Sequence, residues 1–188
     1  MAKADTKTRL MDAAEQLVRH RGADGFSYAD LSTSIGIQKA SIHYHFPAKS
    51  DLLQAIMEQY SRQVIEILEG FCDTLPSPAE QLRAFVDFYR LALQEGDCLC
   101  LCVALTIGKE SLSEGTQKAV LNFRAAVQKW LENRFAQLLS PPSATWGSPS
   151  EEAAATLALV EGAQVSARIA TDPRHFDHAT RAFCNRLP

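Results

Sequence analysis

The stretch from Ser27 to Lys49 reads SYADLSTSIGIQKASIHYHFPAK and decides the fold. Ser27 and Asp30 stand three residues apart, close to a capping box, which marks the first turn of a helix. Gly36 then permits the positive φ of a tight turn. Pro47 ends a second short helix, because the residue before a proline is biased away from helical backbone. Two short helices joined at Gly36 are the layout of a helix-turn-helix.

The second of these helices carries a run of polar side chains that we expect to be exposed. They are Gln38, Lys39, Ser41, His43, Tyr44 and His45. Side chains of these kinds reach phosphates and base edges in the major groove, and the second helix of a helix-turn-helix enters that groove. Lys49 follows near the start of the next helix, where a cation can meet a phosphate. Phe46, in contrast, is expected to fill the small core.

The rest of the chain also shows helical spacing of its apolar residues, and no segment has the period of two that a strand requires. Beyond the two short helices within 27–46, we expect helices over 6–20, from 50 to the break at 75–78, and over 79–95, 98–107, 114–139, 150–171 and 173–186. The sequence therefore predicts an all-α protein of about nine helices. Three compact helices up to residue 46 are joined by one continuous helix to a larger helical part, 47–188.

Composition limits the possible classes of protein. The 188 residues are 46% hydrophobic and 22% charged, close to the average of soluble globular domains. Neither a membrane-spanning run nor a secretory signal is recognisable, so we expect a cytoplasmic protein without a membrane partner. The formal net charge of −3 alone argues against nucleic-acid binding. However, residues 1–60 contain seven Lys/Arg and seven Asp/Glu, so the negative excess lies in the other part of the chain.

Three of the five cysteines crowd into Cys98, Cys100 and Cys102. A disulfide framework is not expected from an odd count in a reducing compartment. In a helix over 98–107, residues two apart diverge by about 200°, so only Cys98 and Cys102 would share a face, and no metal site is expected. Free cysteines commonly pack as small hydrophobes. Thiol-based sensing of oxidants or electrophiles stays open as an alternative.

Two helices of the larger part carry aromatic residues that either fill the core or line an apolar effector pocket. The candidates for ligand or sensor roles are Tyr89, Cys98, Cys100, Cys102, Phe123, Arg124 and Trp130, with Gln128 as a further polar anchor. An apolar pocket with few polar groups is typical of a small-molecule site. We therefore expect an effector of modest size that is largely apolar or electrophilic. No cofactor is implied.

Residues 151–170 are apolar around most of the helix and rich in small side chains. Such a helix is buried on more than one side, as at a subunit interface. With Phe176, Ala179 and Phe183 on the last helix, this predicts a four-helix interface in a homodimer. A homodimer also fits the two-fold symmetry of a palindromic operator.

The N-terminal pattern resembles the TetR family of bacterial transcriptional regulators over about fifty residues. The matching positions are Gly22, Gly25, Phe26, Ser27, Asp30, Leu31, Ser32, Ile35, Gly36, Ile37, Ala40, Ser41, Ile42, Tyr44, His45, Phe46, Lys49, Leu52 and Leu53. The resemblance implies that residues 1–46 bind double-stranded operator DNA. It further implies that residues 47–188 bind a small effector and dimerise through the last two helices. Effector binding would change the separation of the two DNA-binding domains and release DNA.

Individual roles follow from the same resemblance. Ser27 would contact a phosphate at its helix cap, and Lys49 would hold a backbone phosphate. Lys39, Ser41, Tyr44 and His45 would face DNA. His43 departs from the family, which usually has tyrosine there, although histidine can still donate to a phosphate.

The sequence thus predicts a ligand-responsive repressor that is not an enzyme. It has no His-Glu metal pair, phosphate-cradling glycine loop or nucleophile elbow. The alternative is a regulator triggered by covalent modification of Cys100 or Cys102, because some family members that sense electrophiles carry cysteines in this region.

Overall fold

The computed structural model describes residues 5–140 and 146–188, and these residues contain helices and no strand. The helices are α1 (Thr6–Arg21), α2 (Tyr28–Ile35), α3 (Lys39–His45), α4 (Lys49–Thr74), α5 (Pro78–Leu91), α6 (Leu101–Thr106), the 3₁₀ helix η1 (Lys109–Ser111), α7 (Glu114–Leu138), α8 (Pro149–Ala170) and α9 (Arg174–Arg186). The expected all-α class is therefore confirmed.

The chain forms two compact units. Unit 1 consists of Met1–Arg62 with Leu101–Phe123, and unit 2 consists of Gln63–Cys100 with Arg124–Pro188. Helices α4 and α7 each continue across a boundary between the units. The functional division at residue 46 stays a prediction, because the compact units follow packing and place Leu101–Phe123 with the N-terminal residues.

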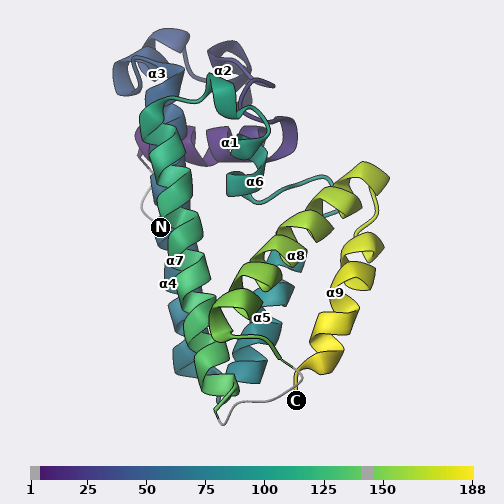
Figure 1. The fold of residues 1–188 in the computed structure, drawn as a ribbon. Coiled ribbons are helices and arrows are strands. Elements are labelled where there is room, and N and C mark those ends of the chain that lie inside the picture. Colours follow the sequence, from purple (N-terminus) through teal and green to yellow (C-terminus); the bar gives the residue numbers. More distant parts are fainter. Residues whose placement is uncertain (1–4, 141–145) are drawn as a thin grey trace. The chain divides into compact units, whose positions relative to one another are not determined.

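Unit 1 is built around α1, which packs against α2 and α6, while α2 packs against α3 (Figure 1). Its core contains fully buried side chains from several helices: Leu10, Val18, Leu31, Ile42 and Leu52. Phe46 is also buried, as predicted. Arg9 on α1 donates from Nη2 to the carbonyl of Ile35 at 3.1 Å. This bond satisfies a carbonyl at the end of α2 that the helix itself leaves unpaired.

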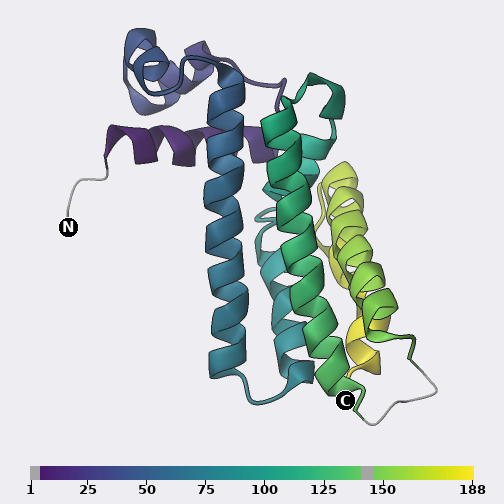
Figure 2. The ribbon, with the colours of Figure 1, turned by 60° about the vertical axis from the view of Figure 1, so that its left-hand side comes forward.

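Unit 2 joins α5 to α8 and α9, and α8 lies alongside α9 in both views (Figures 1 and 2). Ser148 caps α8 in a full capping box with Glu151. Phe176 and Phe183 on α9 are buried within the unit, and the Phe183 ring contacts Phe135 with 6.3 Å between centroids. The protomer's own core thus uses these two rings, whereas Ala179 is exposed. The predicted four-helix dimer interface stays a prediction.

The expected helix over 98–107 is also wrong in its first half. Helix α6 begins only at Leu101, and Cys98–Cys100 is not helical. The preceding chain turns through positive φ at Gln94 (52°) and Gly96 (104°), which also ends α5 at Leu91 instead of residue 95. The Cys100 N–H then donates to the Gln164 side chain at 2.9 Å. Apolar composition predicted burial correctly but could not reveal this side-chain acceptor.

No helix of the described residues is both long and apolar enough to cross a membrane.

Candidate functional site

The helix-turn-helix of unit 1 starts with a complete capping box. Ser27 Oγ accepts hydrogen bonds from the N–H groups of Ala29 (3.2 Å) and Asp30 (3.3 Å). Asp30 Oδ2 in turn accepts from the Ser27 N–H at 2.7 Å and from its hydroxyl at 2.6 Å. These hydrogen bonds hold the pKa of Asp30 below its ordinary value. The box confirms the predicted start of α2 and leaves Ser27 exposed at the helix N-terminus.

The turn between α2 and α3 adopts the left-handed conformation that the sequence predicts at Gly36, with φ of 70°. The Gly36 N–H donates to the Ser32 carbonyl at 3.0 Å. The Ser32 hydroxyl donates to the Ile37 carbonyl, which fixes the chain just before α3. The turn is therefore held from α2 by both backbone and side chain.

Two further bonds place α3 and the start of α4. The Tyr28 hydroxyl donates to the Phe46 carbonyl at 2.9 Å, and burial, together with nearby Asp51, raises the pKa of Tyr28 to about 12. The Lys49 ammonium donates to the Phe26 carbonyl at 2.5 Å and lies 4.3 Å from the centre of its ring. Burial lowers the pKa of Lys49, although nearby carboxylates oppose the shift. Lys49 is thus a structural residue as well as a candidate for phosphate contact.

The polar side chains of α3 differ in exposure. Gln38, Lys39, His43 and Tyr44 are exposed, and Tyr44 reaches 83%. Ser41 and His45 are half-buried and not exposed. The prediction that all six polar side chains are exposed is therefore correct for four of them. The His43 ring meets the Tyr28 ring edge-on, with 4.9 Å between centroids. The exposed side of α3 thus offers one cation, one amide, one phenol and one imidazole.

The seven candidates for ligand or sensor roles do not lie in one unit. Cys102 and Phe123 belong to unit 1, where Phe123 contacts Tyr60 with 5.5 Å between ring centroids. The others belong to unit 2: Tyr89, Cys98, Cys100, Arg124 and Trp130. Arg124 forms an ion pair with Glu161, and all three clustered cysteines are at most 1% exposed.

Within unit 2, Phe85 brings two aromatic candidates together. Its ring centroid lies 4.9 Å from that of Tyr89 and 5.8 Å from that of Trp130. Tyr89 is 1% exposed and Trp130 is 4% exposed. Among the described residues, the Trp130 indole Nε1 has no hydrogen-bond partner. A buried indole N–H usually has one, so a donor is available at this apolar cluster.

Sequence reasoning missed Gln164, which is fully buried on α8. Its Oε1 accepts from the Cys100 N–H at 2.9 Å, and its Nε2 donates to the Tyr89 carbonyl at 2.9 Å. One side chain therefore satisfies the backbone of two separate segments of unit 2. The only available signal was a glutamine in an otherwise apolar, small-residue helix.

Comparison with known proteins matches this chain to a protein family and to a solved structure. Residues 10–56 match the family described as bacterial regulatory proteins, tetR family. A TetR-family transcriptional regulator from Agrobacterium tumefaciens of known crystal structure is 28% identical, has a TM-score of 0.89 and covers 96% of each chain.

Two curated relatives align over shorter regions. The HTH-type transcriptional regulator CymR of Pseudomonas putida is 26% identical over 130 residues, which are 68% of this chain and 64% of CymR. The biofilm operon icaADBC negative transcriptional regulator IcaR of Staphylococcus epidermidis is 32% identical over 62 residues, which are 33% of this chain and 34% of IcaR. The aligned region thus spans less than two thirds of either relative.

A capped α2, a left-handed turn at Gly36 and an exposed polar α3 define a helix-turn-helix DNA-binding protein. The family match covers this motif, and the likeness to the Agrobacterium structure extends over nearly the whole chain. Residues 10–56 thus carry the DNA-binding part of the tetR family of bacterial regulatory proteins, and the fold of the whole chain is similar to that of a TetR-family transcriptional regulator.

Proposed function

We propose that this protein is a homodimeric repressor that leaves a palindromic operator when a small effector binds in unit 2. The observation that carries the proposal is α3, which is anchored by Tyr28 and presents an exposed polar face. CymR and IcaR are regulators by name, and IcaR is named a negative one. These relatives support repression as the direction of control.

The DNA contacts divide by chemistry. Lys39 and Tyr44 are exposed on α3, so they suit base edges or phosphates within the groove. His43 and the half-buried Ser41 and His45 add further hydrogen-bonding groups, and Gln38 stands at the helix N-terminus. Ser27 and Lys49 flank this surface and suit phosphates, which fix orientation without reading sequence.

The dimer interface is proposed on the outer side of α8. The exposed small or apolar residues there are Ala154, Ala155, Ala158, Gly162, Ser166 and Ile169, and Ile169 is 82% exposed. Small side chains allow close approach of a second helix. A dimer would place two α3 helices on half-sites one helical turn apart, or a multiple of it.

The effector is proposed to bind at the aromatic cluster of Phe85, Tyr89 and Trp130. The buried indole N–H of Trp130 favours a largely apolar molecule with one hydrogen-bond acceptor. The alternative trigger, covalent modification of Cys100 or Cys102, requires a reagent to reach side chains that are at most 1% exposed. We therefore favour non-covalent binding of an effector over covalent modification as the trigger.

The test is DNA binding by the full chain to the region upstream of its own gene, measured by gel shift with unlabelled competitor. We expect a salt-sensitive complex that resists non-specific competitor. Absence of such a complex would count against the DNA-binding function.

A second experiment screens for effectors by following Trp fluorescence and DNA release together. Release that is lost when Cys98, Cys100 and Cys102 are all serine would instead support the covalent trigger.

A further inference from the structure

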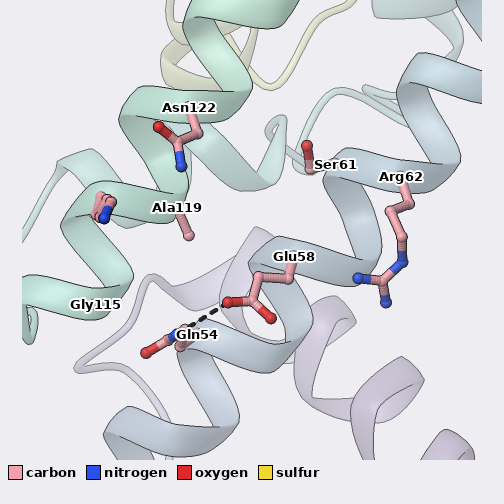
Figure 3. A pocket seen from close by; sticks show the side chains of 8 residues that line it. Gln54, Glu58, Ser61, Arg62, Gly115, Ala119 and Asn122 are labelled. Atoms are coloured by element: carbon pink, nitrogen blue, oxygen red, sulfur yellow. Dashed lines mark hydrogen bonds between the residues drawn. The ribbon is translucent and has the colours of Figure 1, made fainter.

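A polar groove of about 400 Å³ lies between α4 and the first turns of α7, within unit 1 (Figure 3). Its lining residues are Gln54, Glu58, Ser61 and Arg62 from α4, and Gly115, Lys118, Ala119 and Asn122 from α7. This volume lies in the range of small-molecule sites. None of the eight residues has a role in the proposed DNA or effector contacts.

A glycine shapes one end of the groove. A Cβ atom at Gly115 would lie only 2.1 Å from Gln54 Oε1, so the missing side chain lets the Gln54 amide lie against α7. Gln54 Nε2 then donates to Glu58 Oε1 at 2.9 Å, as the dashed line in Figure 3 shows. This bond holds the Glu58 carboxylate at the Gln54 end of the groove.

The groove also contains two cations, Arg62 and Lys118, which are not paired with its carboxylate. Glu58 and Arg62 are four residues apart on α4, a spacing at which opposite charges commonly pair. Within the part of the chain that the structure describes, neither Arg62 nor Lys118 forms an ion pair. Asn122 and Ser61 add an amide and a hydroxyl to the lining. The lining therefore combines two unpaired cations, neutral donors and one carboxylate.

We propose that this groove binds an amino dicarboxylate, the chemical class of L-glutamate and L-aspartate. Such a ligand has two carboxylates and one ammonium, the complement of the charges that line the groove. Arg62 suits one carboxylate because its guanidinium offers a planar pair of donors. Lys118 and Asn122 suit the other carboxylate, and Glu58 suits the ammonium. Because the groove is open, salt screens these contacts, so affinity falls as ionic strength rises.

The test is isothermal titration of the full chain with L-glutamate, L-aspartate, glutarate and L-glutamine. We expect saturable binding of at least one amino dicarboxylate. Glutarate lacks the ammonium and L-glutamine lacks the second carboxylate, so each should bind about tenfold or more weakly than L-glutamate. Failure of both amino dicarboxylates to bind at millimolar concentration would overturn the proposal, and equal affinity for glutarate and L-glutamate would do the same.

Variants assign the binding to this groove. Arg62→Ala and Lys118→Ala should each weaken binding about tenfold or more, and Glu58→Gln should remove the preference for L-glutamate over glutarate. Arg62, Lys118 and Glu58 are exposed, and circular dichroism checks that the variants remain folded. Lys129→Ala is the matched control, because Lys129 is an exposed cation of α7 outside the groove. Unchanged affinity in both Arg62→Ala and Lys118→Ala would show that the ligand binds elsewhere.

Discussion

At the scale of single residues, Asp30 makes the stability of the capping box at the start of α2 dependent on pH. Its carboxylate accepts two hydrogen bonds from Ser27, which lower its pKa in the folded protein. A carboxyl with a depressed folded pKa stabilises the fold above its unfolded pKa, and this contribution is lost as pH falls through the folded pKa. The capping box should therefore weaken below about pH 4, the unperturbed range of aspartate.

Asp30→Asn should therefore change the pH dependence of stability. The stability difference between wild type and variant should be largest above about pH 5 and should shrink as pH falls to about 3. Urea unfolding at a series of pH values measures it. Asp73→Asn, an exposed carboxylate in the last turn of α4, is the control and should show no comparable trend. A difference that stays constant with pH would contradict the role of the charge.

Two lysines near α3 should behave differently when truncated. Lys39 is exposed, whereas Lys49 donates to the Phe26 carbonyl and lies over its ring. Lys49→Ala should cost about 1–3 kcal/mol of unfolding free energy, because the part-buried carbonyl of Phe26 loses its charged donor. Lys39→Ala should leave stability within about 0.5 kcal/mol.

Both lysine variants should also weaken DNA binding under the proposed function. If Lys49 contacts a phosphate, its loss lowers affinity for all sequences alike and reduces the salt slope by about one. Denaturant unfolding and binding to two unrelated DNA sequences separate the effects on stability and on DNA contact. A Lys49→Ala protein as stable as wild type would show that the bond to Phe26 contributes little.

At the scale of elements, local chemistry predicted both bounds of α2 but not the start of α6. The Ser27–Asp30 spacing gave the start of α2, and the glycine turn gave its end, since both signals act within a few residues. Just before α6, the Cys100 N–H donates to Gln164, sixty-four residues further along the chain. The burial of Phe176 and Phe183 likewise depends on how α9 packs within unit 2. No local pattern contains either contact, and the groove between α4 and α7 was missed for the same reason.

Replacing Gln164 should destabilise unit 2, because its side chain joins two segments of this unit. Gln164→Leu keeps a similar volume but leaves the buried Cys100 N–H and the Tyr89 carbonyl without the amide that now pairs them. The expected loss is about 3 kcal/mol, because losing one partner of a buried hydrogen bond costs about 1–3 kcal/mol and Gln164 makes two such bonds. Thermal and urea unfolding measure it. Val165→Leu, a half-buried neighbour on α8, is the control and should cost much less.

At the scale of the whole molecule, the five thiols report which parts of the fold open. Cys98, Cys100 and Cys102 are at most 1% exposed, whereas Cys72 and Cys184 are only half-buried. A native protein should therefore react with a thiol reagent at Cys72 and Cys184 first. Burial, with Asp87 nearby, raises the pKa of the Cys184 thiol, so Cys184 should react slowly near neutral pH, since the thiolate is the nucleophile.

Mass spectrometry of protein labelled for increasing times checks this order, and labelling in guanidinium chloride, where every thiol should react, provides the reference. If labelling of the clustered thiols requires global opening, its rate should rise in Gln164→Leu, which destabilises the fold. Labelling of Cys100 or Cys102 as fast as Cys72 in the native wild type would contradict their burial. That result would reveal a local opening next to α6 and, under the proposed function, would favour covalent modification over non-covalent binding as the trigger.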